Sequence, residues 1–408
     1  MDLGFAPFDP RLFDDPYPVY ARLRAEAPLY RGPGHRFWTL SRFEDIRAAL
    51  ADHETFSSDA ERGGIGITPA EAGGEPLPAG SHEFPAGNLI LMDPPRHTAF
   101  RKVVTPRFLQ KSMAPFGPRV REIVDDLLDA FCETGEADAM ERFTCAVPAL
   151  VFADVLGVPR SRGRELQRWA AELTTVPTTA EGGARHREAV AAVRALFGEL
   201  LEQKRAHPVD DLLSDMARET GPGRTFDEVE FVGMATSMMI AGNDTTANAL
   251  AALLLLLARH PDERRKLHAD PDRIESAVEE GLRFEPPVHG LARVLTRDVE
   301  LHGQRLREGE KVLLLYASAN RDERVFDAPD RFDVERKIDL HLAFGFGVHS
   351  CVGLRLGRLE MQIALRAFLE RIPEWEIDPG AVRWRHLFAT RQLDGLPIRF
   401  EPTPRRRG

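Results

Sequence analysis

The stretch Phe344-Gly345-Phe346-Gly347-Val348-His349-Ser350-Cys351-Val352-Gly353 places one cysteine in a loop with three glycines. Glycine lets the backbone adopt positive φ and come close to a ligand. A helix predicted to begin near Val352 would direct the positive end of its dipole toward the Cys351 sulfur, which favours the thiolate. The pattern is typical of a loop that holds a thiolate against a flat metal cofactor. The alternative is a buried structural cysteine in a glycine-rich turn.

The order F-G-x-G-x-H-x-C-x-G resembles the haem-binding loop of the cytochrome P450 family. The resemblance implies that Cys351 is the axial ligand of the iron in haem b (iron protoporphyrin IX). In that family the thiolate donates electron density that favours O–O cleavage. The resemblance also implies contacts between the haem and Phe344, Gly345, His349 and Gly353.

Length and composition indicate an ordinary globular protein, with 408 residues, 43% hydrophobic and 29% charged. A net charge of −10 argues against nucleic acid as a partner. Three cysteines give no disulfide framework, so we expect a reducing, cytoplasmic location. Two of them, Cys132 and Cys145, lie in apolar helical context and are expected to be inert. The N-terminus lacks a signal-peptide pattern, and the longest apolar run, 249–258, is shorter than a membrane span of about 18 residues.

Residue spacing predicts a mostly α fold with a small β region. Helical periodicity is found at 15–30 and 41–53 and dominates from about 95 to 280. Strand-like stretches occur at 37–40, on both sides of His302-Gly303, and at 393–400, where we expect a short hairpin. The family resemblance implies a single prism-shaped domain over residues 1–408. Two Gly/Pro-rich or polar stretches, 59–88 and 175–186, are expected to form a lid over the substrate.

The segment from Phe226 to Arg259 is apolar nearly all round and predicts a long helix through the core. Thr225 and Glu228 fit a capping box at its start, and His260-Pro261 fits its end. In its middle lies Ala241-Gly242-Asn243-Asp244-Thr245-Thr246. A glycine inside a helix costs about 1 kcal/mol relative to alanine, and an acid in an apolar core costs more. Such local conflicts are expected at functional sites.

This middle segment resembles the A-G-x-[D/E]-T motif of the same family. The resemblance implies that Ala241 lies against the haem, that the Thr245 hydroxyl bonds the dioxygen co-substrate, and that Asp244 relays protons from water. A plainer alternative is that the Thr245 and Thr246 hydroxyls bond back to helix carbonyls and bend the helix.

The pair Glu280 and Arg283 matches the E-x-x-R motif of the family and lies on one helix face. On most helices such a pair is solvated and contributes little. Arg331, within Pro329-Asp330-Arg331-Phe332, resembles the third member of the family's network. The resemblance therefore implies a buried Glu280–Arg283–Arg331 network that supports the cysteine loop.

The stretch Asp93-Pro94-Pro95-Arg96-His97-Thr98-Ala99-Phe100-Arg101 resembles the family's D-P-P-x-H-x-x-x-R motif, and the prolines fit a helix start. His97 and Arg101, four residues apart, then share one helix face. The two haem propionates need cationic donors. The resemblance implies that His97, Arg101, Arg293 and His349 supply them.

Residues around the proposed oxygen site are expected to contact the substrate. One group precedes Asp244 on the long helix, a second follows the E-x-x-R helix, and a third lies in the C-terminal turn. His289 departs from the family pattern, because this position is usually apolar; it bonds a polar substrate group or turns away. The full set is Ser237, Ile240, Ala241, Val288, His289, Leu291, Ala389 and Thr390.

The resemblance implies a monooxygenase that inserts one oxygen atom from O₂ into a largely apolar small molecule, by hydroxylation or epoxidation. Electrons from NAD(P)H are expected to arrive through a separate ferredoxin and its reductase, docked near Arg101, Lys102, Arg355 and Arg358. A monomer without membrane association is expected. The alternatives are a haem-thiolate peroxygenase or isomerase, a non-catalytic haem sensor, and a cysteine hydrolase using His349.

Overall fold

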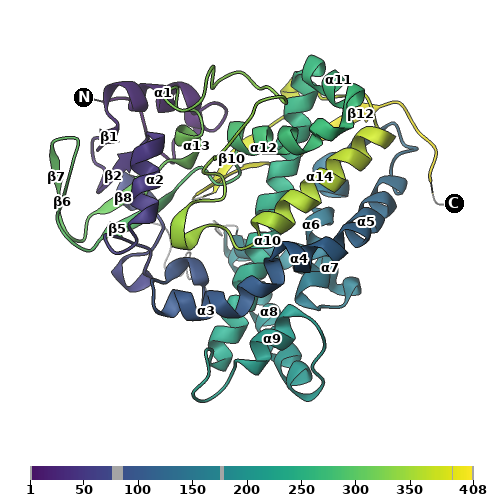
Figure 1. Ribbon diagram of the computed structural model, residues 1–408, viewed down its shortest axis with the longest axis horizontal. Coiled ribbons are helices and arrows are strands. Elements are labelled where there is room, and N and C mark those ends of the chain that lie inside the picture. The colour runs from purple at the N-terminus through teal and green to yellow at the C-terminus, as the bar shows by residue number, and fades with distance from the viewer. Residues whose placement is uncertain (1, 76–85, 175–178, 388, 407–408) are drawn as a thin grey trace.

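The computed structural model describes residues 2–75, 86–174, 179–387 and 389–406. Helices dominate it and the strands are short, so the predicted mostly α fold with a small β region is confirmed (Figure 1). The helices are α1 Tyr17–Glu26, α2 Phe43–Ala51, α3 Arg96–Val104, α4 Gln110–Met113, α5 Gly117–Asp129, α6 Ala146–Leu156, α7 Gly163–Thr174, α8 Ala180–Ala206, α9 Leu212–Arg218, α10 Glu228–Arg259, α11 Pro261–Ala269, α12 Ile274–Phe284, α13 Tyr316–Ala319 and α14 Leu354–Arg371. The strands are β1 Leu29–Tyr30, β2 Phe37–Leu40, β3 Phe56–Ser57, β4 Glu136–Asp138, β5 Leu291–Leu295, β6 Val299–Leu301, β7 Gln304–Leu306, β8 Lys311–Leu314, β9 Trp375–Glu376, β10 Trp384–Leu387, β11 Thr390–Leu393 and β12 Pro397–Phe400.

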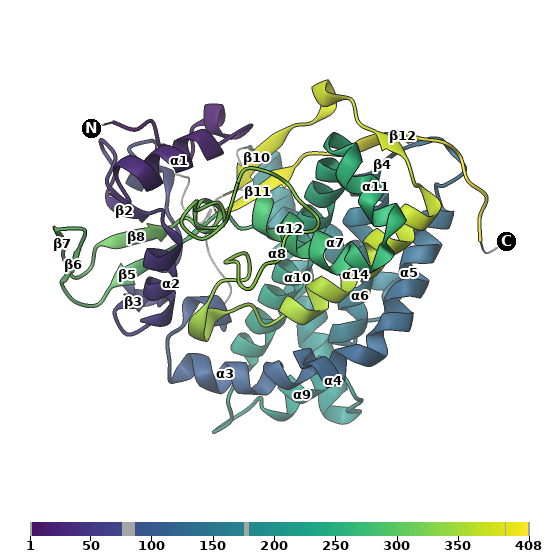
Figure 2. The same cartoon turned by 45° about the horizontal axis from the view of Figure 1, so that its top comes forward.

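The largest sheet has five strands in the order β1-β2-β8-β5-β3. Strands β2 and β8 pair in parallel, with Phe37 opposite Lys311, and the other neighbours pair antiparallel. Helices α1 and α2 lie beside this sheet, apart from the main helical body (Figure 2). Their buried side chains join those of the sheet in a separate hydrophobic cluster. The strand predicted at 37–40 is therefore confirmed, as are the strands on both sides of His302.

Helix α10 is the centre of the larger hydrophobic cluster and packs against α6, α7, α8, α12 and α14. Among the described helices it alone is long and apolar enough to cross a membrane, but 67% of its most apolar window is buried within the protein, as expected for a core helix. Its capping box is formed by Asp227 and Glu230, so the predicted box at Thr225 and Glu228 is wrong. Both pairs carry suitable side chains, but the Thr225 hydroxyl donates to Glu219 instead.

The glycine in the middle of α10 has a packing reason. A Cβ atom on Gly242 would lie 2.7 Å from the Phe152 ring on α6, closer than side chains pack. Gly242 therefore allows α6 to press against α10 at the height of Asp244 and Thr245. The cost of a helical glycine is offset by this helix–helix contact.

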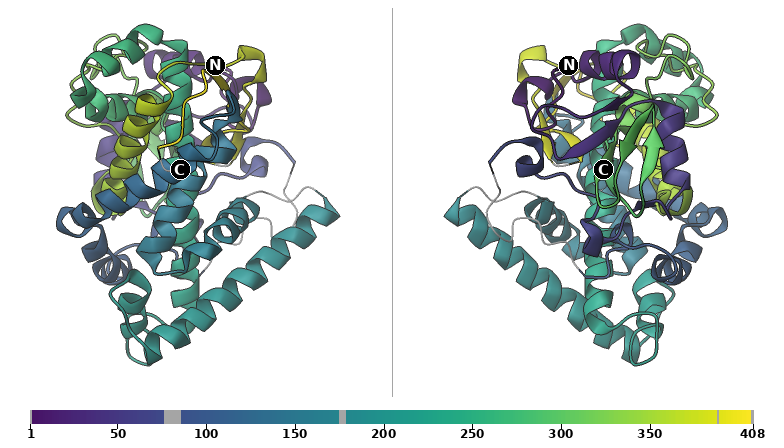
Figure 3. Two further views of the ribbon diagram at one scale, coloured as in Figure 1. Left: turned by 90° about the vertical axis from the view of Figure 1, so that its right-hand side faces the viewer. Right: turned by 90° about the vertical axis from the view of Figure 1, so that its left-hand side faces the viewer.

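Two expectations about local structure are corrected. The C-terminal hairpin joins β10 and β11, whereas β12 pairs with β4 and β9, because the chain crosses to another sheet after Leu393. The lid stretch 175–186 is largely helical where it is described: α8 begins at Ala180, and the Thr179 hydroxyl caps it by accepting from the Gly182 N–H. Residues 175–178 lie outside the described residues. Figure 3 shows α8, in teal, extending along one edge of the molecule.

The other predicted lid stretch, 59–88, contains short 3₁₀ turns at Ala60–Arg62 and Pro69–Ala72. The second turn is closed by a capping box of Thr68 and Glu71. Residues 76–85 of this stretch lie outside the described residues. The described part is thus less irregular than its glycine and proline content indicates.

Candidate active site

The cysteine loop is shaped by two glycines with positive φ, Gly345 at 66° and Gly347 at 69°. A Cβ on Gly347 would lie 2.4 Å from the Leu50 carbonyl oxygen, so the loop passes close to α2. The Cys351 N–H donates to the Phe344 carbonyl at 2.8 Å, which closes the loop. Helix α14 then begins at Leu354, close to the predicted start.

Cys351 is an exposed residue, although protein atoms surround its thiol. Burial raises its pKa, while the Gly353 N–H and the charges of Arg101 and Arg358 act in the opposite direction. A coordinated metal ion deprotonates a thiol outright. Accessibility, a hydrogen-bond donor and two nearby cations together suit Cys351 to be a thiolate ligand.

Part of α10 is open, in contrast to the rest of this core helix. Ala241 is exposed, and Asp244, Thr245 and Thr246 are partly exposed. A Cβ on Gly357, in the first turn of α14, would lie 3.7 Å from the Thr246 hydroxyl. The start of the helix that follows Cys351 therefore lies beside the acid–alcohol segment, and accessible space exists next to both. A large flat cofactor would fit against accessible residues of this kind on two neighbouring segments.

The hydroxyl of Thr245 donates to the Ala241 carbonyl at 2.8 Å, as the plainer sequence alternative expected. Its oxygen keeps lone pairs that can accept a hydrogen bond. Burial raises the pKa of the Asp244 carboxyl, and this rise is partly opposed by a hydrogen bond from Thr174 and by the charge of Arg385. Asp244 is thus suited to hold a proton inside the protein.

Four cationic or imidazole side chains gather at one side of the cysteine loop. The rings of His97 and His349 lie 4.4 Å apart between centroids. Both nitrogens of buried His97 and Nε2 of His349 have no hydrogen-bond partner in the described part of the protein. Arg101 donates to the carbonyls of Val348 and Ser350 at 2.8 and 2.7 Å, and Arg293 is 2% exposed.

Unpartnered imidazole nitrogens beside two arginines indicate a missing anionic ligand. Burial, then the charge of Arg101, lowers the pKa of His97 to about 4. Burial and the charges of Arg293, His97 and Arg101 lower the pKa of His349 to about 2. The carboxylates of two haem propionates would supply the acceptors and negative charge that this cluster lacks. The residues present therefore fit the haem that the sequence resemblance implies.

This cluster predicts acid sensitivity of the haem-free protein. The ordinary pKa of His97 is 6.5, and in the folded protein it falls to about 4. As pH falls through this interval, the unfolded chain takes up the His97 proton first, so folded stability decreases with acidity. Urea unfolding is measured at about pH 7 and about pH 5, because this pair of values samples the interval between the two pKa values of His97. The free energy of unfolding should decrease less between these pH values for His97→Phe than for the wild type. Equal losses in both proteins would contradict the assignment.

The E-x-x-R pair forms a buried network with a third arginine that differs from the predicted one. Arg283 binds both carboxylate oxygens of Glu280 at 2.7 and 2.8 Å, and both side chains are fully buried. Arg336 reaches the same carboxylate at 3.2 Å. The prediction of Arg331 is wrong: its side chain is 70% exposed and pairs with Asp333. Arg336 also bonds carbonyls in the preceding loop, which turns its guanidinium inward.

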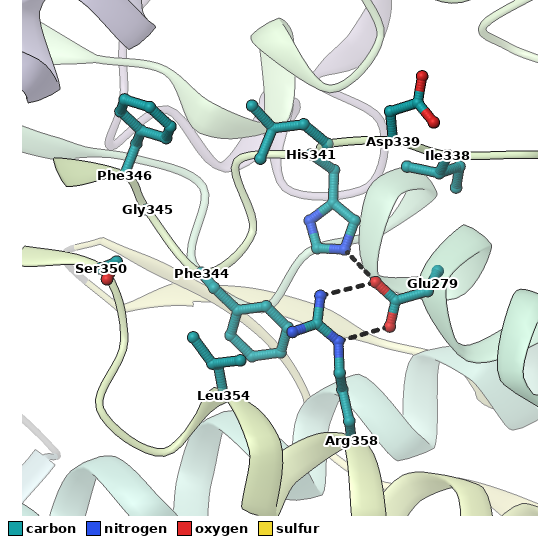
Figure 4. Close-up of a pocket in the computed structure, with 11 residues that line it drawn as sticks. Glu279, Ile338, Asp339, His341, Phe344, Gly345, Phe346, Ser350, Leu354 and Arg358 are labelled. Carbon is teal, nitrogen blue, oxygen red and sulfur yellow. Dashed lines mark hydrogen bonds and ion pairs between the residues drawn. The ribbon is translucent and has the colours of Figure 1, made fainter. Parts of the chain in front are cut away.

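A second network, which the sequence interpretation missed, lies beside the first. Glu279 is held by Arg358 through two bonds of 2.7 Å and by His341 at 3.2 Å (Figure 4). Burial raises the pKa of Glu279, but Arg358 and His341 overcome this and lower it to about 2. Arg358 also lies 4.6 Å from the centre of the Phe344 ring. No sequence motif marked Glu279, which directly precedes Glu280 of the E-x-x-R pair.

These contacts line a cavity of about 190 Å³ under the cysteine loop, bounded also by Ile338, Leu354 and Ser350.

The four basic residues expected to dock a ferredoxin differ in their availability. Arg358 and Arg101 form bonds within the protein, whereas Lys102 and Arg355 are exposed.

The residues expected to contact the substrate come from three segments and differ in accessibility. On α10, Ser237 and Ile240 are partly buried, and the Ser237 hydroxyl donates to the Gly233 carbonyl at 2.8 Å. Val288 and Thr390 pair through an isolated β-bridge, which brings the second and third segments together. Leu291 and Ala389 are partly buried beside them.

His289 is the exception among these residues. Its side chain is 4% exposed and bonds Tyr20 and Glu285, so the structure favours the alternative in which it turns away from the substrate. The neighbouring Val288 remains partly exposed. Alternation along an extended segment places successive side chains on opposite faces, which explains the difference.

The fold and these residues define a class of enzyme that binds haem through a cysteine thiolate. The family model described as Cytochrome P450 matches residues 184–387. The chain is 38% identical over 395 residues to cytochrome P450 monooxygenase PikC of Streptomyces venezuelae, covering 95% of this chain and 91% of that protein. It is 36% identical to mycinamicin IV hydroxylase/epoxidase of Micromonospora griseorubida, covering 93% and 94%. The crystal structure of CalO2 superposes with a TM-score of 0.87 at 30% identity, covering 98% of this chain and 99% of that one.

The chain therefore belongs to the cytochrome P450 family, and it is an oxidoreductase of the bacterial monooxygenase type. Haem iron held by a thiolate is the cofactor of this family.

Proposed function

We propose that this enzyme inserts one oxygen atom from dioxygen into a C–H or C=C bond of a largely apolar small molecule. The observation that carries the proposal is the pair Asp244 and Thr245 on the open part of α10. An acid with a raised pKa next to an alcohol can supply protons to the oxygen site, and a peroxygenase, an isomerase or a sensor does not need such a supply. Hydroxylation and epoxidation both appear in the name of the mycinamicin IV relative.

The cofactor is proposed to be haem b, bound between α10 and the start of α14. Cys351 would ligate its iron, and His97, Arg101, Arg293 and His349 would hold its propionates. When bound, the haem supplies the redox-active iron at which dioxygen is reduced. Contacts to the ring are assigned to Ala241, Phe344, Gly345 and Gly353.

Around this site the protein moves protons and excludes bulk water. The Asp244 carboxyl, whose pKa is raised by burial although Thr174 and Arg385 oppose the rise, holds a proton close to the pocket and passes it on from water. The Thr245 hydroxyl donates its proton to the Ala241 carbonyl at 2.8 Å, so its oxygen is left to accept a hydrogen bond in the pocket. Apolar neighbours such as Ile240 and Val288 surround the substrate, and this favours an apolar molecule.

Electrons come from NAD(P)H through a reductase and a separate ferredoxin. The ferredoxin docks on the side of Cys351, near the exposed Lys102 and Arg355. The chain acts as one domain over 1–408, as a cytoplasmic monomer. Acidic ferredoxins suit exposed basic residues through electrostatic steering.

The test is turnover of the haem-loaded protein with isotopically labelled dioxygen. Candidate molecules are first screened by the shift in haem spin state that follows displacement of water from the pocket. Those that bind are incubated with NADPH, a surrogate ferredoxin and its reductase. We expect one labelled oxygen atom in the product. Product formed only with hydrogen peroxide, or product without label, would contradict the proposal.

Asp244→Asn is expected to reduce product formation by about 100-fold, since a positioned acid–base group contributes roughly that much or more. Haem loading and the substrate-induced spin shift should remain, because the amide has nearly the same shape. The matched control is Asp262→Asn on the surface of α11. Full turnover by Asp244→Asn would exclude this residue as the proton relay.

A further inference from the structure

Residues 288–291 and 389–390 form one wall of the proposed substrate pocket, called here the substrate wall. A buried chain of hydrogen-bonded polar side chains lies behind this wall. Tyr20, Glu285, His289 and Arg391 come from α1, the end of α12, the segment before β5, and β11. Each is less than a tenth exposed. The Tyr20 hydroxyl lies 3.2 Å from His289 Nδ1, and His289 Nε2 lies 3.3 Å from Glu285 Oε1. Arg391 donates to the same Glu285 oxygen at 2.5 Å.

The protonation states of the four side chains set which group donates and which accepts in each of their hydrogen bonds. Burial raises the pKa of Glu285, but Arg391 and His289 reverse this and hold it below its ordinary value, so the carboxylate accepts. Burial raises the pKa of Tyr20, so its hydroxyl keeps its proton and donates. Burial lowers the pKa of His289 despite Glu285. His289 is therefore neutral, with Nδ1 accepting from Tyr20 and Nε2–H donating to Glu285.

Arg391 extends the chain to the N-terminal segment. Its Nε and Nη2 atoms donate to the carbonyls of Phe13 and Asp14 at 3.0 and 2.7 Å. The Tyr17 hydroxyl, one turn before Tyr20, donates to the Phe284 carbonyl at 3.1 Å. The N-terminal residues and α1 are thus tied to the end of α12 by directed, partly buried hydrogen bonds.

The same residues carry the backbone that joins two segments of the proposed substrate wall. The His289 N–H donates to the Ala389 carbonyl at 2.8 Å, and the Arg391 N–H donates to the Pro287 carbonyl at 3.0 Å. Between these bonds, Val288 and Thr390 form their β-bridge. Side chains on one face of this bridge are engaged by the polar chain, and Val288 on the other stays partly exposed.

We propose that the chain Tyr20–His289–Glu285–Arg391 is a specificity-determining support of the substrate pocket. These bonds hold residues 288–291 and 389–390 in place against α1, so the substrate wall keeps one shape. The four side chains act through the wall and do not contact the ligand themselves. The inference rests on the proposed function, because that function assigns these segments to the pocket. This role explains the polar residue at position 289. An apolar side chain there would only pack, whereas His289 forms a directed hydrogen bond with Tyr20 and another with Glu285.

The wall is tested with two haem ligands of different size, imidazole and phenylimidazole, titrated into the haem-loaded protein and followed by the Soret band. Imidazole reports access to the iron, whereas the phenyl ring reports the wall. Tyr20→Phe removes one hydroxyl and keeps the ring, and it should weaken phenylimidazole binding about fivefold, the effect of one lost buried hydrogen bond. Imidazole binding should stay unchanged.

His289→Leu removes both bonds and should weaken phenylimidazole binding more than Tyr20→Phe. His289→Gln, which can still donate to Glu285, should recover part of the loss. The matched control is Tyr30→Phe, a second buried tyrosine hydroxyl of the N-terminal region, which bonds Leu3 and Asp2 and lies outside the chain. It should change neither affinity.

Urea unfolding of each variant separates support of the pocket from general stability. If Tyr20→Phe and His289→Leu lower stability but bind phenylimidazole like the wild type, the chain is merely structural and the inference is overturned. The same holds if both ligands weaken equally. If His289→Leu fails to fold, Tyr20→Phe and His289→Gln decide alone. A wild-type protein that binds haem but neither ligand would overturn the inference alone, because the proposed function is tested separately by turnover with labelled dioxygen.

Discussion

Arg283→Ala is expected to lower the free energy of unfolding by about 3–5 kcal/mol, the cost of leaving a buried charge without its partner. Glu280 is fully buried, and Arg283 occupies both of its oxygens. Arg283 also donates to the carbonyls of Asn320 and Pro329 at 2.9 Å, so three elements lose a bond at once. The measurement is urea unfolding followed by circular dichroism.

Two further arginine variants make this result specific. Arg331→Ala should stay within about 0.5 kcal/mol of the wild type, as an exposed surface pair does. Arg336→Ala should fall between the two, because its bond to Glu280 is longer and it is 10% exposed. If Arg331→Ala cost as much as Arg283→Ala, the network would include Arg331, as the sequence motif implied.

Cys351→Ser is expected to abolish thiolate ligation and to reduce turnover by at least about 100-fold, since even indirect changes at metal sites cost 10–100-fold. Serine cannot supply the electron-rich sulfur that favours O–O cleavage. Haem content, measured by the pyridine haemochrome method, should fall, and any haem retained should lack thiolate absorption.

Cys145→Ser is the matched control for this experiment. Burial, together with the charges of Asp244 and Asp138, raises the pKa of Cys145 to about 12, so its thiol stays protonated. Cys145 also lies outside the glycine-rich loop, at the start of α6. The variant should keep wild-type spectra and turnover. A loss equal to that of Cys351→Ser would show that the wrong cysteine was assigned.

Elements set by local sequence were predictable. Glycines at 345 and 347 impose the cysteine loop, and the Pro94-Pro95 pair marks the start of α3. The apolar run of α10 predicted the core helix within two residues. Its cap was misplaced because Thr225 and Asp227 both satisfy the same local pattern, and only the tertiary position of Glu219 distinguishes them.

Interactions between distant segments were not predictable from spacing. Arg331 and Arg336 lie in one loop, and which of them returns to Glu280 depends on how that loop folds over α12. His289 bonds Tyr20, which lies 269 positions earlier in the chain, and the carbonyl of Ala389, which follows much later; a single sequence carries no pairing signal over such distances. The network of Glu279 was missed because adjacent glutamates on a helix normally reach solvent.

The central claim, that Cys351 holds haem iron as a thiolate, is tested most directly by one spectrum of the wild-type protein. The haem-loaded enzyme is reduced with dithionite, exposed to carbon monoxide, and its difference spectrum recorded. We predict the strongly red-shifted Soret band that a thiolate-ligated haem gives in its carbon monoxide complex. A band at the shorter wavelength typical of histidine-ligated haem would contradict the account.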